Sequence, residues 1–364
     1  MSAASGKKVI VGMSGGVDSA VAAWLLKRDG YDVAGLFMHN WEEEGECPAA
    51  DDWRDAKAVA DMIGIECYSV NFAKEYMDGV FEYFLREYRA FRTPNPDVLC
   101  NRVVKFGAFR DYCMSIGAKY IATGHYCRVD GAETESPSLL RAVDCAKDQS
   151  YFLNQVETEQ LKNVIFPLGG MKKPEVRALA EKIGLPVARK KDSTGICFIG
   201  ERKFKRFLFE YLPAQPGDIV DAAGKTVGRH DGLMYYTLGQ RRGLGIGGVK
   251  GEAGRWFVLG KDVEHNRLIV SCGDESELYT NALTGCDFNI IGSRDGIETG
   301  DKIKCTAKTR YRQADFGATL TALDNGKFEL EFDTPQRAVT PGQYAVVYKG
   351  ERCLGGGVIE SARK

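Results

Sequence analysis

The segment SGGVDS at residues 14–19 has the composition of a phosphate-binding loop. It follows an apolar run at residues 8–13 and precedes residues 17–28, where apolar side chains recur at helical spacing. Gly15 and Gly16 let backbone amides approach an anion, and the helix N-terminus adds about half a positive charge. The two serines add hydroxyl donors. The segment therefore predicts a phosphate site between a strand and a helix.

This loop is not a Walker A motif, because no Lys-Ser or Lys-Thr pair follows the glycines. Walker A loops hold β- and γ-phosphates for γ-phosphoryl transfer, so a different leaving group is indicated. The alternative is a turn that only caps the helix, with Asp18 as a first-turn acid. A second glycine-rich segment, GLGIGG at 243–248, has the spelling of a dinucleotide motif but no helical period after it, so we interpret it as a loop.

Two cysteines lie in unusual contexts. If Asp97 caps a helix, Cys100 occupies the third helical position, where the helix terminus favours a thiolate and lowers the pKa below about 8.5. The alternative is that Asp97 is only a cap and Cys100 a small buried residue. Cys197 is flanked by Ile196 and Phe198, as packed cysteines are, yet many cations surround it. These are Arg189, Lys190, Lys191, Arg202, Lys203, Lys205 and Arg206, against only Asp192 and Glu201.

A second basic run covers residues 302–312 and contains no acid. Its charged side chains are Lys302, Lys304, Lys308, Arg310 and Arg312, and Tyr311 offers a stacking surface. Such a run fits contact with RNA phosphates, and the alternative is the solvated face of a strand, which the run by itself favours slightly. The net charge of −1 excludes a globally basic nucleic-acid binder but leaves a local basic face open.

The elements around these segments predict a doubly wound α/β fold. Strands are expected at residues 8–13, 32–40, 65–72 and 119–124, with helices at 17–28, 51–64, 74–89, 100–117 and 174–184. From Asp218 onward, short strand-like runs alternate with Gly and Asp, and an Asn-Gly turn marks a hairpin within 318–332. We predict a first domain at 1–203, a central β-rich domain at 204–278 and a last domain at 279–364 that forms a β-barrel.

The 364 residues suffice for two or three domains at roughly 150 residues each. With 44% hydrophobic and 27% charged residues, the chain falls outside the disordered and fibrous classes. No apolar run reaches the roughly 18–20 residues of a membrane span, and the first residues resemble no secretion signal, so we expect a cytoplasmic protein without membrane contact. Eleven dispersed cysteines and four histidines, without a C-x-x-C pair, argue against a disulfide framework or a fixed metal site.

Several segments together are similar to one family. They are GMSGGVDS (12–19), NPDVLCNRVVKF (95–106), ATGHY (122–126), KDQSYFL (147–153), KKDSTGICFIGERKF (190–204), LGQRRGLGIGG (238–248), TRYRQ (309–313) and PGQYAVVY (341–348). By these motifs the chain resembles the bacterial tRNA-specific 2-thiouridylases of the PP-loop ATP pyrophosphatase superfamily. The resemblance implies 2-thiolation of the wobble uridine of tRNA, with adenylation of the uridine 2-oxygen and release of pyrophosphate and AMP.

The same resemblance implies roles for individual residues. ATP with Mg²⁺ is expected on Gly12, Met13, Ser14, Gly15, Gly16, Val17, Asp18, Ser19, Met38 and Gly124, with Asp18 a candidate Mg²⁺ ligand. Cys100 is the expected nucleophile, Cys197 the expected persulfide carrier that forms a transient disulfide with it, and Asp97 an acid or base candidate. The target base is expected at Asn95, Pro96 and Asp97. Contacts with tRNA are expected at His125, Lys147, Asp148, Gln149, Arg310, Tyr311 and Gln343.

The resemblance also implies a partner that supplies sulfur, either a persulfide sulfur-carrier protein or a cysteine desulfurase. Two routes remain open: hydrosulfide released by Cys100 attacks the base, or the Cys197 persulfide attacks it directly. Two other functions fit the phosphate loop alone. One is a synthetase that adenylates a small metabolite, and the other is a non-enzymatic module that binds tRNA or carries sulfur.

Overall fold

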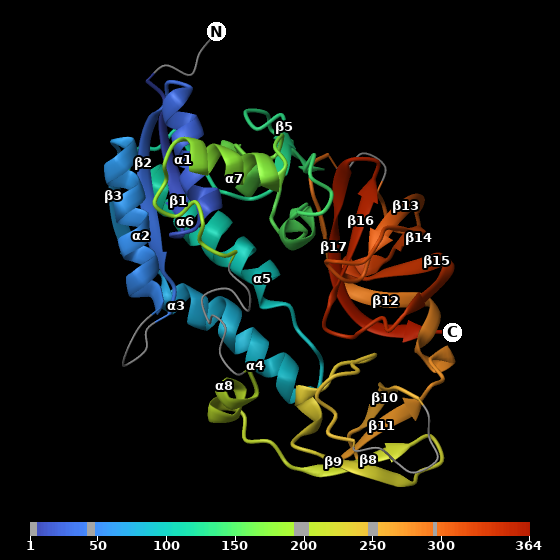
Figure 1. The fold of residues 1–364 in the computed structure, drawn as a ribbon. Helices are drawn as coiled ribbons and strands as arrows, with labels where there is room; N and C mark the ends of the chain where they lie inside the picture. Colours follow the sequence, from blue (N-terminus) through green and yellow to red (C-terminus); the bar gives the residue numbers. More distant parts are fainter. Residues whose placement is uncertain (1–5, 42–47, 193–203, 247–253, 294–296) are drawn as a thin grey trace.

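The computed structural model describes residues 6–41, 48–192, 204–246, 254–293 and 297–364 (Figure 1). An α/β part at the N-terminal end lies beside two β-rich parts formed by the rest of the chain. Among the described residues, no helix combines the length and apolar character needed to cross a membrane.

The α/β part contains a five-stranded sheet in which all neighbours run parallel. Its order is β3 (Glu66–Asn71), β2 (Asp32–His39), β1 (Lys8–Met13), β4 (Tyr120–Ala122) and β7 (Val164–Ile165). The chain adds β2 and β3 on one side of β1 and then crosses to β4 on the other. This reversal creates a switch point beside β1, where ligands of such sheets bind. The predicted doubly wound sheet is confirmed.

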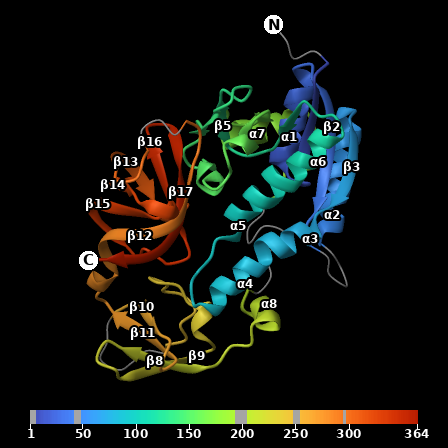
Figure 2. The same cartoon turned by 180° about the vertical axis from the view of Figure 1, so that it is seen from behind.

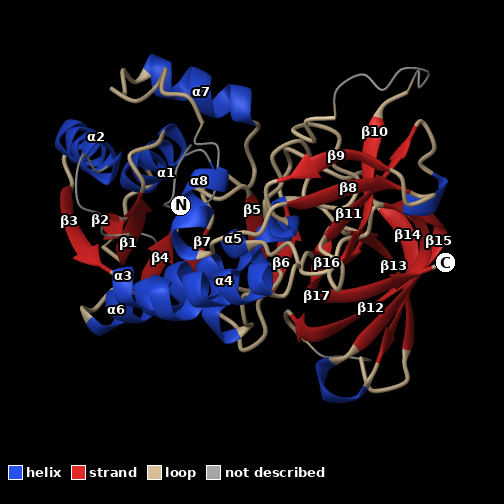
Figure 3. Ribbon diagram, turned by 90° about the horizontal axis from the view of Figure 1, so that it is seen from below, coloured by secondary structure: helices blue, strands red, loops and turns tan. Residues whose placement is uncertain are grey.

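Helices cover both faces of this sheet (Figure 3). One face carries α1 (Val17–Arg28), α2 (Pro48–Ile63) and α7 (Lys173–Lys182). The other carries α3 (Ala73–Tyr76), a π-helix (Met77–Phe81), α4 (Glu82–Arg89), α5 (Pro96–Leu99), a second π-helix (Cys100–Ala108) and α6 (Phe109–Ser115). The side chains of β1 alternate between the two cores, since Ile10 joins the second face while Val9 and Val11 join the first.

The two long helices predicted on the second face are present but contain π-helical turns. The two helices cross closely in these turns: a Cβ atom at Gly79 would lie 2.6 Å from Cγ1 of Val103, and each residue belongs to one of the π-helical segments. Wider turns of this kind are rare and often accompany functional sites. Helical periodicity alone does not distinguish them from α-helix.

The C-terminal part is a closed six-stranded barrel, which confirms the prediction of a terminal β-barrel. Its order is β12 (Tyr279–Ile290), β15 (Phe328–Arg337), β14 (Phe316–Ala322), β13 (Lys302–Lys308), β16 (Tyr344–Lys349) and β17 (Arg352–Arg363), and β12 pairs with β17 to close it. The predicted hairpin joins β14 to β15, with positive φ at Asn325 and Gly326.

In sequence, a four-stranded sheet preceded by α8 (Phe204–Tyr211) lies between the α/β part and the barrel. Its order is β10 (Trp256–Asp262), β11 (Arg267–Cys272), β8 (Gly217–Asp221) and β9 (Thr226–His230). The domain limits at 203 and 278 stay predictions.

One hairpin was not predicted. Strands β5 (Cys127–Asp130) and β6 (Ser138–Arg141) belong to the N-terminal half, yet β6 pairs with β17 through Leu140 and Arg352. The hairpin thus extends the barrel sheet to eight strands and joins it to the α/β part (Figure 2). Backbone pairing therefore fixes one against the other.

Candidate functional site

The phosphate loop sits at the carboxyl end of β1, as predicted. Gly15 has φ +69°, and a Cβ atom there would lie 2.3 Å from the carbonyl oxygen of Asp52, so only glycine fits. The backbone N–H of Ser14 donates to Oγ of Ser19 at 3.2 Å, and that hydroxyl donates to the carbonyl of Gly16 at 3.1 Å. The loop is therefore preformed around the first turn of α1.

Asp18 in that first turn is held by a buried cation. Both of its carboxylate oxygens lie 2.7 Å from Nζ of Lys173, and the hydroxyl of Tyr126 donates to Oδ1 at 2.8 Å. Burial together with this carboxylate raises the pKa of Tyr126, so the phenol stays protonated. A Cβ atom at Gly124 would lie 2.8 Å from the backbone of Asp18, which brings the end of β4 directly against the loop.

Lys173 also reaches Asp192, the last described residue before the segment that contains Cys197. Its Nζ lies 2.9 Å from Oδ1, while Lys147 and Arg177 bind the same carboxylate at 2.8 and 2.5 Å. Burial raises the pKa of Asp192, but hydrogen bonds from Lys147 and Lys173 outweigh it and lower the pKa below its usual range. Sequence reasoning missed Lys173, because its partners are far apart in the chain and no local pattern links them.

Part of the cation-rich segment before Cys197 is already paired. Nζ of Lys190 contacts Asp52 at 2.7 Å, Asp55 at 2.5 Å and the carbonyl of Gly15 at 3.0 Å. This lysine therefore supports the phosphate loop from outside. Cys197 and its other neighbours in 193–203 lie outside the described residues.

The positions predicted to hold ATP converge at the carboxyl edge of β1, β2 and β4. Met38 is 7% exposed, and its Cε lies 3.5 Å from the Cβ position of Gly12. Gly124 meets the loop from the other side. Met13 and Val17 point into the core under α1 and shape the loop from below. Glycine amides, serine hydroxyls and a helix N-terminus suit the phosphates of a nucleotide. No cluster of three metal-ligating side chains occurs in the described part of the chain.

The structure corrects the expected cap before Cys100. The N-cap of α5 is Asn95, not Asp97, and Pro96 and Asp97 are the first two helical residues. Cys100 therefore lies at the start of the π-helix, past the first turn, where the helix dipole no longer has its full effect. It is fully buried and belongs to the same apolar cluster as Met38. The helix-terminus argument for a thiolate does not hold at this position.

The residues just before Asn95 are held by contacts from distant parts of the chain. Nε2 of Gln343 donates to the carbonyls of Thr93 and Pro94 at 2.7 and 3.3 Å. The N–H of Thr93 donates to the carbonyl of Pro341 at 3.1 Å. From the central sheet, Nζ of Lys261 donates to the carbonyl of Phe91 at 2.8 Å. The barrel and the central part together therefore hold residues 91–95.

His125 and the segment 147–149 follow β4 and β6. Nδ1 of His125 lies 2.8 Å from Oγ1 of Thr123, and burial with a contribution from Lys105 lowers the pKa of the imidazole well below 6.5. Asp148 is 5% exposed and accepts from the N–H groups of Ala142 and Ser150 at 3.1 and 3.2 Å. Its side chain thus shapes the turn that presents Lys147 and Gln149.

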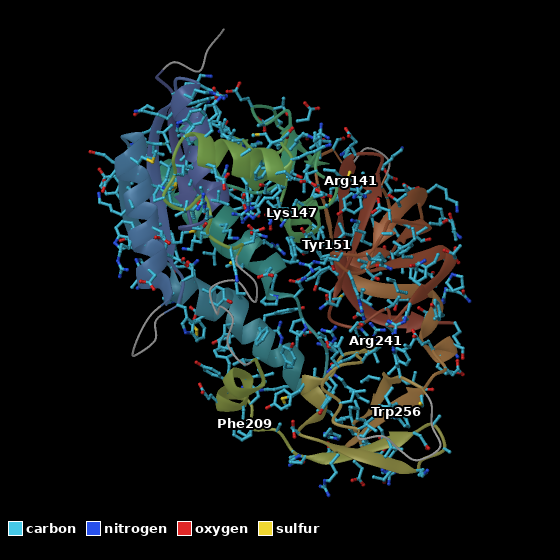
Figure 4. All side chains as sticks on the ribbon, viewed as in Figure 1. Arg141, Lys147, Tyr151, Phe209, Arg241 and Trp256 are labelled. Carbon is cyan, nitrogen blue, oxygen red and sulfur yellow. The ribbon has the colours of Figure 1, made fainter. Side chains whose placement is uncertain are left out.

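The predicted residues of the barrel lie at its contacts with the other parts. Arg310 donates to the carbonyls of Leu238 and Ala338 at 3.0 and 2.8 Å. The ring of Tyr311 packs on Phe152 with centroids 4.3 Å apart, and its hydroxyl lies 3.4 Å from the carbonyl of Lys147. Figure 4 shows Arg141, Lys147 and Tyr151 along this junction.

The basic run 302–312 contains no acid, but folding supplies two. Lys304 contacts Asp333 at 2.8 Å, and Lys308 contacts Asp315 at 3.5 Å. The charges within residues 302–312 alone therefore overestimate the positive potential around this strand.

Fold and loop define a protein of the PP-loop class, and a family model described as "tRNA methyl transferase HUP domain" matches residues 7–201. Models described as "tRNA methyl transferase PRC-barrel domain" and "Aminomethyltransferase beta-barrel domain" match residues 205–272 and 281–359. The chain belongs to the family of tRNA-specific 2-thiouridylases, which confirms the resemblance seen in the sequence.

Two relatives show this over almost the entire chain. The tRNA-specific 2-thiouridylase MnmA of Lactococcus lactis subsp. cremoris (strain MG1363) is 56% identical over 98% of this chain and 96% of its own length. That of Proteus mirabilis (strain HI4320) is 56% identical over 99% of each. Among solved structures, the U34-tRNA thiolase NcsA from Methanococcus maripaludis is 21% identical with a TM-score of 0.36, over 57% of this chain and 65% of that one.

Proposed function

We propose that this protein is an ATP-dependent tRNA-uridine 2-sulfurtransferase that thiolates the wobble uridine. The observation that carries the proposal is the 56% identity to tRNA-specific 2-thiouridylases over 98% of the chain. The preformed loop without a Walker lysine adds support, because it suits transfer of the nucleotidyl group with pyrophosphate as the leaving group.

In the first step, the uridine 2-oxygen attacks the α-phosphorus of ATP and pyrophosphate departs. The amides of Gly15 and Gly16 and the start of α1 bind the departing phosphates. Mg²⁺ neutralises phosphate charge when bound, and Asp18 is its candidate ligand. Both oxygens of Asp18 accept from Lys173, so a metal ion at Asp18 would compete with this lysine for the carboxylate.

In the second step, sulfur from a Cys197 persulfide replaces AMP at carbon 2 of the ring. Either Cys100 attacks the persulfide and frees hydrosulfide, or the persulfide attacks the ring and Cys100 then cleaves the resulting bond. Both routes leave a Cys100–Cys197 disulfide, which an external reductant must open. The two cysteines, Asp97 as acid or base, and the sulfur-donating partner belong to this proposal.

The tRNA would lie where the barrel meets the α/β part. Tyr311 contacts Lys147 at that junction, and Gln149 lies two residues further along the chain. Arg310 contacts Leu238 of the central part, and Gln343 contacts the segment leading to the target-base residues Asn95 to Asp97. The anticodon loop is single-stranded, so extrusion of its base costs little.

The test is a reconstituted reaction with ATP-Mg²⁺, a persulfide donor and unmodified tRNA, resolved on a mercury-containing gel. We expect thiolated tRNA with the wild type and none with Cys100→Ser or Cys197→Ser. Unchanged product in both variants would contradict the cysteine mechanism and favour a small-metabolite synthetase. Absence of pyrophosphate release with the wild type would favour a non-enzymatic tRNA-binding role.

A further inference from the structure

Asn40 is a buried polar side chain without a partner among the described residues. It follows β2 directly and is 2% exposed, yet neither Oδ1 nor Nδ2 makes a hydrogen bond to any residue that the structure describes. Native proteins almost always pair buried amides, because an unpaired one loses its water contacts without compensation. An unpaired amide on a functional edge of the sheet therefore points to a ligand that completes it.

The alternation of β2 places Asn40 on the side of the sheet that Met38 faces. Leu36 and Met38 join one core, whereas Phe37 between them joins the other. The carbonyl of His39 still accepts from the N–H of Phe72 at 2.7 Å, so pairing with the neighbouring segment continues to the end of the strand. Asn40 is the next residue on the Met38 side, one step closer to the carboxyl edge.

That edge is the one that carries the phosphate loop. Met38 Cε lies 3.5 Å from the Cβ position of Gly12, immediately before the loop. A nucleotide with its phosphates on the loop has its base a few ångströms away along the same edge, as ligands at the switch point of open sheets do. Asn40 follows β2 directly and so lies at this edge of the sheet.

Two other buried asparagines in the described part of the chain each have at least one paired amide atom. Nδ2 of Asn154 donates to the carbonyl of Tyr151 at 2.7 Å, and its Oδ1 accepts from Gln155 at 3.2 Å. Nδ2 of Asn101 donates to the carbonyl of Phe152 at 3.1 Å, while its Oδ1 has no partner among the described residues. Asn40 thus differs from these residues in that both atoms of its amide lack a partner among the described residues.

We propose that Asn40 is a specificity-determining residue that pairs with the adenine ring of ATP. A carboxamide offers one donor group and one acceptor side by side, and adenine presents its 6-amino group next to a ring-nitrogen acceptor. The pair is bidentate and satisfies both atoms of the amide. This inference rests on the proposed use of ATP and adds the residue that reads its base.

The experiment measures nucleotide binding calorimetrically without tRNA, for the wild type, Asn40→Leu and the matched control Asn154→Leu. We expect Asn40→Leu to bind ATP about 10- to 100-fold more weakly. The wild type should prefer ATP over purine riboside triphosphate, which lacks the 6-amino group, and Asn40→Leu should lose this preference. Asn154→Leu should keep both the affinity and the preference.

Thermal unfolding of the ligand-free proteins separates this role from a structural one. Leucine has nearly the shape of asparagine, so Asn40→Leu removes an unpaired amide and should raise Tm, whereas Asn154→Leu breaks bonds and should lower it. Unchanged ATP affinity in Asn40→Leu overturns the inference. If ATP affinity is unchanged and Tm falls, Asn40 is a structural amide. If ATP affinity is unchanged and the KM for tRNA rises, Asn40 contacts the target base. A wild type that binds no ATP contradicts the proposed function itself.

Discussion

The phosphate loop and the segment before Cys100 are positioned in contrasting ways. The loop is built from a strand, a glycine turn and a helix that are contiguous in sequence, and its internal bonds join residues a few positions apart. Residues 91–95 of the α/β part are instead held by contacts from the other two parts of the molecule. These contacts come from Gln343 and Pro341 of the barrel and from Lys261 of the central sheet. The backbone of the phosphate loop is therefore built locally, with side-chain support from Lys173 and Lys190 far along the chain. The segment that leads to the residues proposed for the target base is positioned only in the complete fold.

This contrast predicts that damage to the loop abolishes ATP use without involving the barrel. Gly15→Ala combines positive φ with a Cβ atom 2.3 Å from Asp52, so we expect ATP-dependent pyrophosphate release to fall by about 100-fold or more. The control Gly30→Ala has φ +90° but open space around it, and should keep activity while losing about 1 kcal/mol of stability. Equal activity loss in both variants would mean that strain, not the contact with Asp52, matters.

The Lys173 network should show the next largest effect. Lys173→Met leaves Asp18 and Asp192 without their shared cation, and the side chain of Lys173 is only 9% exposed. We expect the free energy of unfolding to fall by about 2–4 kcal/mol. This is less than for a fully buried ion pair, because both carboxylates are one-third exposed. Chemical denaturation at pH 7 measures it. Lys74→Met, which breaks an exposed pair with Asp78, is the control and should leave the free energy of unfolding almost unchanged.

The pH dependence of Asp192 follows from its lowered pKa. A carboxyl whose pKa is lower in the folded state contributes stability above its unfolded pKa of about 4 and loses it as pH falls toward the folded pKa. The stability difference between the wild type and Asp192→Asn should therefore be constant near neutral pH and narrow below about pH 4. A difference that stays constant down to pH 2 would show that the ion pairs do not depend on this charge.

Loss of the Gln343 contacts that hold residues 91–95 should affect the tRNA step alone. Gln343→Leu removes the bonds to Thr93 and Pro94, so we expect the kcat for tRNA thiolation to fall about tenfold, with ATP affinity unchanged. Gln336→Leu removes amide bonds within the barrel and should leave kcat intact. A change confined to the KM for tRNA would instead assign Gln343 to direct RNA contact.

The smallest effect is expected on the barrel strand β13. Neutralising Lys302 should lower the salt slope of tRNA binding by about one unit if it contacts a phosphate. Lys304 and Lys308 already contact Asp333 and Asp315, so their replacement by alanine should change the slope less. Filter binding at several salt concentrations measures the slopes, and no change for any of the three would identify a solvated strand face.

The sequence by itself determined the parallel sheet, the loop at the end of β1 and the barrel hairpin, because strand periodicity, Gly15 and the Asn325–Gly326 turn act over a few residues. It placed the helix cap at Asp97 instead of Asn95, since both types suit a cap and Pro96 decides between them. Only the tertiary structure decided the pairing of β6 with β17, the π-helical turns at Gly79 and Val103, and the reach of Lys173 to both Asp18 and Asp192. The physical reason is the separation in sequence of the residues that interact. Backbone preferences depend on neighbouring residues, whereas ion pairs, the contacts on residues 91–95 and unpaired amides depend on which distant surfaces the folded chain brings together.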